Sequence, residues 1–468
     1  MSHPCHGKRL LFPFVSMALI AMLVIGCSGV NTTTTTPASP NAVNGNAFVI
    51  GTDAPAAGVI SFAVQVQSVN AIDTSGNSVS LVSGSPTVDF ARYNGLQTLL
   101  DLNAVPVGTY NSVKITLGTA TIGYLNTQAG TAPTIQTESA TLSTNTVTVA
   151  LATPLVVSQT EPVGLRVDFD LYKSIQVDGN GQITGNVTPT FDVAAVAPTD
   201  SGGHIDDFDA AVVSVNATGQ SFVIQGPHGH QFTVQVNGQT EFDNGENLSD
   251  LTTSSIVEIS GTIETADSTI SADEVAILSQ DGFHAGGQVT YVQPSSGTAT
   301  SFNLYVRDLL PTTTGLSLGQ IATVDLTGNE KYFIYWMHNP LTQFLFNSNG
   351  LLPGQHVSIG GPASGATNAQ AVTAKRVVLR NWGFNGTVVA GSVNTANNTF
   401  QINVNGFAGL LVSNPVTVYI GAGTDFRDGL TSMSGLPTAS NIRVVGLLIK
   451  DPLSGNPVLL ARHIDQLN

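Results

Sequence analysis

Apolar and polar residues alternate along most of the chain from Phe48 onward. Apolar side chains occupy every second position in runs such as residues 62–66, 113–117 and 167–171. Runs of this kind, bounded by Gly, Asn and Pro, are typical of half-buried β-strands. Helical periodicity is scarce, and residues 93–102 are its best short candidate. The pattern therefore predicts an all-β fold that is divided into several domains.

The first domain is predicted to be a β-sandwich over residues 47–197. Residues 52–55 (Thr-Asp-Ala-Pro) follow its first expected strand, and residues 106–110 (Pro-Val-Gly-Thr-Tyr) form a turn that leads into a core strand. These two segments are similar to the bacterial lipoprotein family catalogued as domain of unknown function 4382. The resemblance implies an exported β-sandwich with no assigned activity. Asp53 is expected to cap its loop through hydrogen bonds, and a ligand-binding role is the alternative.

Three copies of a degenerate repeat follow a polar and acidic boundary at residues 198–206. The matching segments are 257–261 with 357–361 and 442–446, and then 272–275 with 374–377 and 461–464. They divide the rest of the chain into units 207–281, 283–381 and 383–468, each with enough short strands to close a small β-barrel. The units resemble the small domain catalogued as domain of unknown function 5666, and we expect OB-like barrels.

Residues 1–26 have the pattern of an export signal. A basic start precedes a mostly apolar run over residues 10–25, which is short for a membrane span. Gly26 followed by Cys27 resembles the lipobox of bacterial lipoproteins, which implies cleavage after Gly26 and lipidation of Cys27. A plain anchor helix, or a signal with an incidental cysteine, is the alternative.

Residues 27–46 are predicted to be an extended tether. They are rich in Thr and Pro and carry few apolar anchors. Ser28, directly after Cys27, resembles the sorting pattern for the outer membrane. We therefore expect an exported, lipid-anchored protein, at the outer membrane or cell surface rather than at the inner membrane.

Composition removes several classes of function. Charged residues make up 10% of the chain, and the formal net charge is -16. Nucleic acids and anionic lipid surfaces are bound mainly through Lys and Arg, so both are disfavoured as partners. After cleavage at Gly26 the cysteine that remains is Cys27, so neither a disulfide framework nor a four-cysteine zinc site is available. No cofactor is predicted.

No convincing catalytic motif is present, and we do not expect an enzyme. A Gly-x-Ser-x-Gly string at residues 315–319 lacks the strand and helix that flank a nucleophile elbow, so it is predicted to be a loop. Arg166, Asp168 and Asp170 share one face of an expected strand. We interpret them as a solvated face, and a hydrolase that uses the two carboxylates is a weaker alternative.

Two groups of residues carry metal-ligand chemistry. His228 and His230 have a spacing that suits one side of a strand and could bind Zn²⁺ or Cu²⁺, although a hairpin turn is the favoured interpretation. Residues 204–209 contain one His and three Asp and could bind Ca²⁺ loosely. We favour a solvated acidic linker for this segment.

Residues 331–340 form the most distinctive segment, because aromatic side chains lie on both faces of the expected strand. Tyr332 and Trp336 share one face, and Tyr335 lies on the other. A strand that is apolar on both faces is either buried or part of an interface. Packing against a neighbouring unit is the favoured interpretation, and contact with a partner or a glycan is the alternative.

The combined pattern predicts a non-enzymatic protein of the cell envelope with a binding, adhesion or scaffolding role. It would contact the membrane through its lipid anchor alone, and its partner would be an envelope polysaccharide or another envelope protein. A carbohydrate-binding accessory protein that uses the aromatic residues around Trp336 is the alternative.

Overall fold

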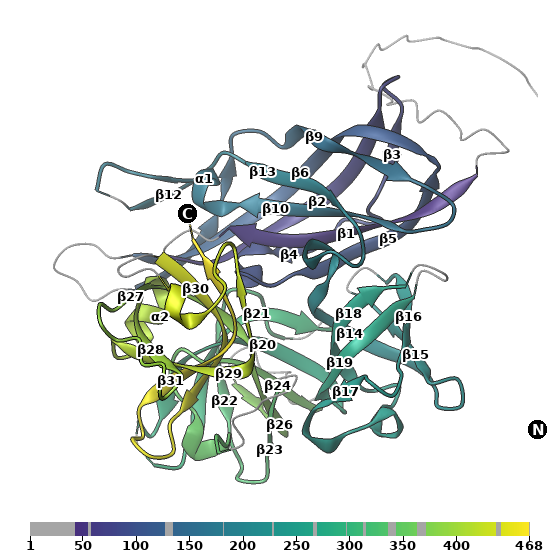
Figure 1. Ribbon diagram of the computed structural model, residues 1–468. Helices are drawn as coiled ribbons and strands as arrows, with labels where there is room; N and C mark the ends of the chain where they lie inside the picture. The colour runs from purple at the N-terminus through teal and green to yellow at the C-terminus, as the bar shows by residue number, and fades with distance from the viewer. Residues whose placement is uncertain are drawn as a thin grey trace, which may run out of the picture. The chain divides into compact units, whose positions relative to one another are not determined.

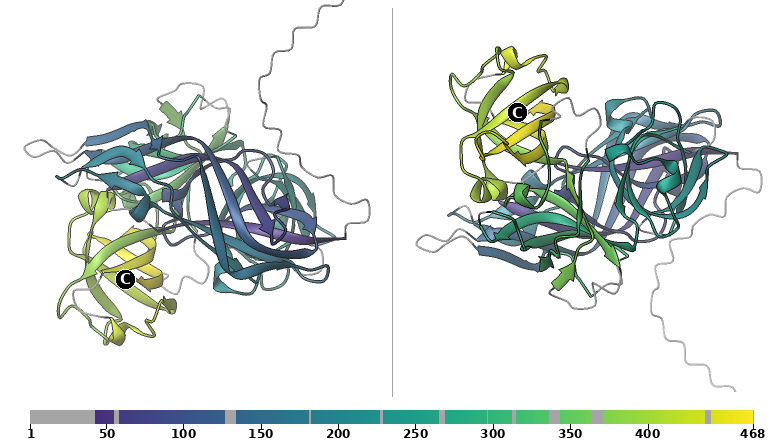
Figure 2. Two further views of the ribbon diagram at one scale, coloured as in Figure 1. Left: turned by 90° about the horizontal axis from the view of Figure 1, so that it is seen from above. Right: turned by 90° about the horizontal axis from the view of Figure 1, so that it is seen from below.

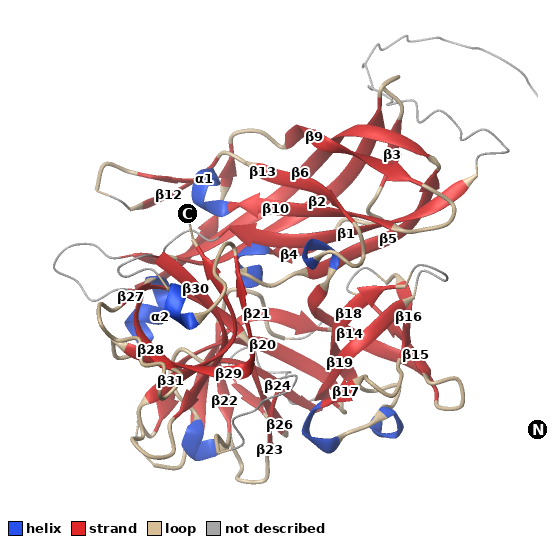
Figure 3. Cartoon of the chain, in the orientation of Figure 1, coloured by secondary structure: helices blue, strands red, loops and turns tan. Residues whose placement is uncertain are grey.

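The structure of the chain is a computed structural model. It describes residues 43–54, 58–126, 134–180, 182–226, 229–264, 269–295, 297–311, 315–335, 343–362, 371–436 and 441–467. Nearly every regular element is a β-strand, as Figure 3 shows, and α1 (Leu171–Ser174) and α2 (Gly406–Leu411) are short. The predicted all-β fold is confirmed. Within the described residues, neither α-helix has the length and apolar character that a membrane span requires.

The first domain contains two principal sheets (Figure 1). The first sheet, in the order β13-β10-β1-β5, contains β1 (Asn44–Ala54), β5 (Thr98–Pro106), β10 (Val163–Asp170) and β13 (Phe191–Val196). The second contains β2 (Val59–Asp73), β3 (Ser78–Ser80), β4 (Thr87–Asp89), β6 (Gly108–Asn126), β7 (Thr134–Ser139) and β9 (Thr146–Val157). A small third sheet contains β8 (Thr141–Leu142), β11 (Ile175–Val177) and β12 (Ile183–Val187), and the 3-10 helix η1 (Phe90–Tyr93) follows β4.

The two principal sheets share one hydrophobic core. Val49 on β1, Phe62 on β2 and Phe169 on β10 are fully buried in it. The rings of Phe62 and Phe169 meet edge to face with their centroids 5.1 Å apart. An aromatic pair of this geometry contributes about 1 kcal/mol beyond the area that it buries. Apolar contacts of this kind hold the two sheets together as a sandwich.

Strand β1 is buried on both of its faces. Val49 lies in the core of the sandwich, whereas Phe48 and Ile50 belong to the core of the first repeat. A strand that is buried on both faces has a continuous apolar sequence, as residues 47–50 do. The outer face of β1 therefore joins the sandwich to the first repeat through apolar contacts.

The first repeat forms a sheet that returns on itself. It contains β14 (Ile205–Asn216), β15 (Ser221–Gln225), β16 (Gln231–Gln235), β17 (Glu241–Phe242), β18 (Ile256–Ile263) and β19 (Ile270–Ser279). The strand order is β16-β15-β14-β18-β19-β17, and β16 also pairs with β19 in parallel, Val234 opposite Ile270. The 3-10 helix η2 (Ser201–Gly203) precedes β14, and η3 (Asp243–Gly245) and η4 (Leu248–Asp250) connect β17 to β18.

The second repeat forms a seven-stranded sheet in the order β23-β26-β24-β20-β21-β22-β25, and the third closes into a five-stranded barrel. The second contains β20 (Gly282–Gln293), β21 (Ser301–Leu310), β22 (Ile321–Asp325), β23 (Lys331–Ile334), η5 (Ser348–Gly350), β24 (His356–Pro362), β25 (Ala371–Thr373) and β26 (Arg376–Arg380). The third contains β27 (Trp382–Val388), β28 (Thr399–Val404), β29 (Val416–Arg427), η7 (Met433–Gly435), β30 (Asn441–Lys450) and β31 (Pro457–Gln466). These last strands close into a barrel in the order β27-β28-β29-β31-β30, drawn in light green and yellow in Figure 2. Whether the repeats are OB-like stays a prediction.

A recurrent glycine has a steric reason in these repeats. The register of β18 against β19 shifts between Ser260 and Gly261, and that of β30 against β31 shifts between Val445 and Gly446. A Cβ atom on Gly261 would lie 2.1 Å from the carbonyl oxygen of Ser271, and one on Gly446 would lie 1.9 Å from that of Leu460. A bulge that brings a neighbouring carbonyl this close leaves room for glycine alone.

Candidate functional site

A cluster of buried charged side chains lies where the first domain meets the first two repeats. We call it the charge cluster, and its members are Arg92 on η1, Asp207 and Asp209 on β14, Glu258 on β18, His284 on β20, Asp308 on β21 and Arg380 on β26. Their side chains are each at most 9% exposed. Although only 10% of its residues are charged, the chain places several of them together in its interior.

The aspartates of the charge cluster come from the segment predicted to be a solvated acidic linker, and that prediction is wrong. Residues 205–209 begin β14, where Phe208 enters the core of the first repeat. Asp207 and Asp209 lie two residues apart and therefore face the other side of the strand. Because the sandwich and the second repeat cover that side, these carboxylates are buried.

Two arginines bind these aspartates from opposite ends of the sequence. Arg92 places Nη2 2.6 Å from Asp207 Oδ1 and 2.5 Å from Asp209 Oδ2. Arg380 Nη2 donates to Asp207 Oδ1 at 2.8 Å, whereas its Nε lies 2.6 Å from Glu258 Oε2 without forming a hydrogen bond. Hydrogen bonds between ionised groups are about twice as strong as those between neutral groups. The cluster thus ties together the sandwich, the first repeat and the second repeat.

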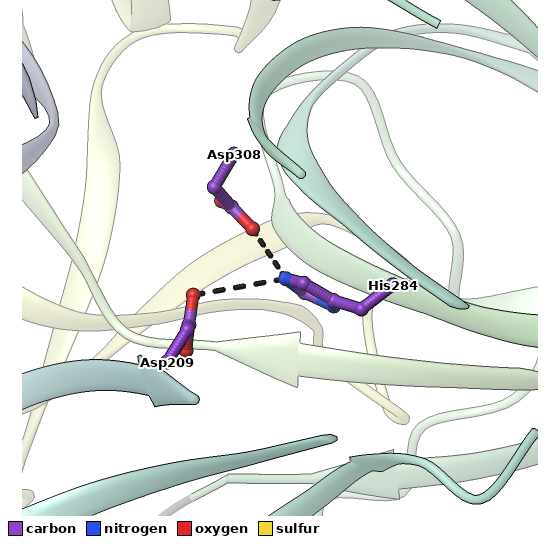
Figure 4. A group of neighbouring side chains, drawn as sticks. All are labelled: Asp209, His284 and Asp308. Carbon is purple, nitrogen blue, oxygen red and sulfur yellow. Dashed lines mark hydrogen bonds and ion pairs between the residues drawn. The ribbon is translucent and has the colours of Figure 1, made fainter. Parts of the chain in front are cut away.

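His284 completes the cluster between two carboxylates, as Figure 4 shows. Its Nε2 atom contacts Asp308 Oδ1 and lies 3.6 Å from Asp209 Oδ2. Burial lowers the pKa of His284, but Asp308 and Asp209 raise it further, so that the net pKa lies above the usual range. Gly286 makes room for this contact, because a Cβ atom there would lie 2.2 Å from Asp308 Oδ2.

The carboxyl groups of the cluster divide into two kinds. Burial favours the neutral form of all of them, but Arg92 and His284 hold the pKa of Asp308 well below its usual range, and Arg380 and Arg92 do the same for Asp209. Burial raises the pKa of Glu258 far above its usual range, and the neighbouring aspartates add to that shift. Burial also raises the pKa of Asp207, although Arg92 and Arg380 oppose this shift.

The geometry alone would let a metal ion be held by Asp209, His284 and Asp308, or by Asp207, Asp209 and Glu258. The same carboxylates are already paired with two guanidinium groups. Asp308 and Asp209 raise the pKa of His284, which disfavours the neutral imidazole that a metal ion requires. We therefore assign the cluster to ion pairing.

A cavity of about 450 Å³ opens beside the charge cluster. Its apolar wall consists largely of leucines from the sandwich and the second repeat: Leu99, Leu100, Leu309, Leu310, Leu316 and Leu318. Its polar end is formed by Asp89, Arg92, Asp209, Arg307 and Asp308. We call it the leucine cavity. Ligand sites commonly occupy about 300–1,000 Å³ and combine an apolar wall with a few polar groups.

Arg307 at the polar end of the leucine cavity is only partly hydrogen-bonded. Its Nε donates to Asp89 Oδ2 at 3.2 Å, and its guanidinium carbon lies 4.3 Å from the centroid of the Trp382 ring. Its Nη2 atom is buried and has no hydrogen-bond partner among the described residues. The guanidinium is thus held by Asp89 on one edge, and its Nη2 atom is enclosed by the protein.

The structure describes one residue of the predicted histidine pair, His230. His228 lies outside the described residues. His230 Nδ1 lies 2.6 Å from Asp101 Oδ1, and Asp101 is a buried residue of the sandwich. His230 therefore docks the first repeat on the sandwich, and metal binding by the pair stays a prediction.

The aromatic segment lies partly inside the protein. Tyr335 is 1% exposed and packs with Ala276 and Leu278 of the first repeat. Tyr332 is half-buried, and its ring centroid lies 5.7 Å from that of Phe346. Trp336 lies outside the described residues. Packing against a neighbouring unit is thus what Tyr335 does.

Other candidate residues have structural roles. Asp170 accepts the backbone N–H of Lys173 at 2.9 Å, so it caps α1 instead of facing solvent freely. Asp53 is 2% exposed and accepts the backbone N–H of Leu171 at 3.4 Å, while burial and the neighbouring Asp168 raise its pKa. Residues 315–319 form a loop, as predicted. Gly26 and Cys27 lie outside the described residues.

Sequence reasoning missed most of the charge cluster. Arg92, Glu258, His284, Asp308 and Arg380 were not among the predicted site residues. A usable signal exists for two of them, because Glu258 lies between Val and Ile, and Arg380 follows Val-Val-Leu. A charged residue inside an apolar strand must be paired when it is buried.

Two segments of the chain match known families. Residues 46–184 match the family described as Domain of unknown function (DUF4382). Residues 210–276 match the family described as Domain of unknown function (DUF5666). Both resemblances inferred from the sequence are thereby confirmed for these residues. No curated protein matches the chain.

Proposed function

We propose that this protein is a lipid-anchored protein of the cell envelope that binds a small molecule in the leucine cavity without transforming it. The observation that supports the proposal is the cavity itself, which has about 450 Å³ of space and an apolar wall with one polar end. Such a cavity at the junction of domains is the usual place for a ligand.

The chemistry of the neighbouring groups favours binding over catalysis. In a nucleophilic triad, the histidine lies within hydrogen-bond reach of a hydroxyl or thiol. His284 uses Nε2 for Asp308 and Asp209, and its Nδ1 has no hydrogen-bond partner among the described residues. Arg92 and Arg380 are likewise engaged by the aspartates of the cluster. These groups serve each other rather than a reacting molecule.

A neutral apolar dye tests the proposal. Residues 38–468 form one compact unit that contains every described core, so this fragment is suitable once its folding is verified by circular dichroism. N-phenyl-1-naphthylamine should bind it with increased fluorescence. Leu310→Trp places an indole ring in the cavity and should weaken dye binding by about tenfold or more, since a blocked cavity loses its apolar contacts.

The matched control is Leu453→Trp, at a leucine that is 96% exposed and does not line the cavity. It should leave dye binding unchanged. Absence of dye binding to the folded wild-type fragment, or equal binding by both variants, would contradict the proposal.

The lipid anchor is tested separately on the full chain. Cys27→Ser should abolish incorporation of radiolabelled palmitate, because it removes the expected site of lipidation. It should also move the protein from the membrane fraction to the soluble fraction, because several acyl chains anchor a protein far more durably than one. Cys5→Ser is the control, since residues 1–26 are expected to be removed. Labelling that survives Cys27→Ser would rule out this anchor.

A further inference from the structure

We propose that one corner of the β-sandwich contacts the lipid bilayer through a patch of exposed valines. The patch consists of Val43, Val107 and Val156, and we call it the valine patch. Its partner is the boundary between the head groups and the acyl chains of the bilayer. The proposal rests on the lipid anchor of the proposed function, and it adds a second membrane contact and an orientation of the sandwich.

The three valines lie together at one corner of the sandwich. The backbone N–H of Val107 donates to the carbonyl oxygen of Val43 at 2.8 Å. Val107 connects β5 to β6, and two residues later Thr109 on β6 lies opposite Val156 on β9. Val43 is 48% exposed, Val107 45% and Val156 57%. Single exposed apolar residues are ordinary, whereas neighbouring ones mark an interaction surface.

Val156 occupies a position where a solvated strand would carry a polar residue. Its neighbours Leu155 and Val157 are buried in the core of the sandwich. Successive side chains of a strand point to opposite faces, or leave them at an irregularity, and Val156 is the one directed to the outside. An outer face that met water alone would favour a polar side chain at this position.

The surroundings of the valine patch are uncharged. Residues 43–47, 104–109 and 152–158 contain no Asp, Glu, Lys, Arg or His. Anionic lipid surfaces are bound mainly through Lys and Arg, and this corner offers neither in these segments. The contact is therefore expected to be apolar, and salt should leave it unchanged, because screening acts on charges.

The valine patch lies where the chain leads to the proposed anchor. Cys27 and Val43 are 16 residues apart, and β1 begins directly after Val43 (Figure 1). A chain of this length spans about 20–55 Å, depending on whether it is coiled or extended. A lipidated Cys27 would keep the patch close to the bilayer and raise its effective concentration there. An apolar contact too weak to bind by itself is then sufficient.

Single-cysteine labelling of the full lipidated protein tests the contact. Cys27 carries lipid and residues 1–26 are expected to be removed, so an introduced cysteine is the free thiol of the mature chain. Val107→Cys and Val156→Cys, labelled with the fluorophore NBD, would be reconstituted in phosphatidylcholine vesicles. Doxyl-labelled lipid should quench both labels by about twofold or more, at low and at high salt.

The matched control is Val177→Cys, which carries the same label on the same domain. Val177 is 59% exposed on β11. β1 and β10 run parallel, and α1 and β11 follow the end of β10, so β11 lies at the other end of the sandwich from Val43. Figure 1 shows this arrangement, with the purple start of β1 far from the hairpin of β11 and β12. The label at residue 177 should stay unquenched.

The outcomes distinguish this proposal from the anchor. Quenching at residues 107 and 156 that is no greater than at residue 177 overturns the membrane contact, and the anchor stands if Cys27 still incorporates palmitate. Quenching that disappears at high salt overturns the apolar nature of the contact. A chain that is not lipidated at Cys27 overturns both proposals.

Discussion

Replacement of Arg380 by Met is expected to lower the free energy of unfolding by about 3–5 kcal/mol. The guanidinium is 1% exposed and pairs with Asp207, Asp209 and Glu258. Met fills a similar length but leaves these carboxylates buried with one arginine between them. Removal of one partner from a buried ion cluster is strongly destabilising, because the remaining charge has no water to solvate it.

Urea unfolding of residues 38–468, followed by tryptophan fluorescence, measures this effect. The matched control is Arg427→Met, since Arg427 pairs with Asp425 where the two side chains are 36% and 60% exposed. A surface pair of this kind contributes about 0–1 kcal/mol. Equal unfolding midpoints for the two variants would show that the charge cluster does not hold the fold together.

Stability is expected to fall between pH 6.5 and about 9 because His204 loses a proton there. Its Nδ1 lies 3.1 Å from Asp206 Oδ1, and its Nε2 lies 3.1 Å from Asp273 Oδ2. The two ring nitrogens can donate at the same time only when the ring is protonated. Burial lowers the pKa of His204, but the two aspartates outweigh burial and raise the pKa from 6.5 to about 9.

The sign of this pH dependence follows from the linkage between proton binding and folding. A histidine whose pKa is raised on folding stabilises the protein fully below the unfolded pKa, and this contribution is lost as the pH rises through the folded pKa. The shift corresponds to about 2–3 kcal/mol after allowance for the exposed part of the ring. Unfolding should therefore be measured at several pH values from 6 to 9.5.

His204→Gln supplies the comparison, because Gln cannot gain or lose a proton. Other buried acids also titrate, so the quantity of interest is the difference in unfolding free energy between wild type and variant. That difference should shrink as the pH rises. A difference that stays constant from pH 6 to 9.5 would contradict the assignment to His204.

Alternation and repetition in the sequence determined the fold class. Strands at residues 62–66 and 113–117 were predicted because a side chain on a β-strand faces the same side at every second position. The matching segments at 257–261 and 442–446 both form strands with a shifted register at their glycine. These features are local, since a strand and its bulge depend on the residues of one segment and its neighbour.

Burial of the acidic segment was decided by tertiary structure alone. Residues 204–209 have the same alternation whether solvent or another domain covers their polar face. In the structure Arg92 and Arg380, from distant parts of the chain, lie on that face and convert an expected solvated linker into the centre of a charge cluster. No spacing rule connects these residues, because their contact depends on how separate sheets pack.

The same distinction applies to the candidate site as a whole. The sequence by itself determined that the chain is built of strands and where its repeated segments begin. The leucine cavity exists only because the sandwich and the repeats meet. Local patterns specify which side of a strand is apolar, whereas the packing of domains decides which polar groups are buried together and which are left free.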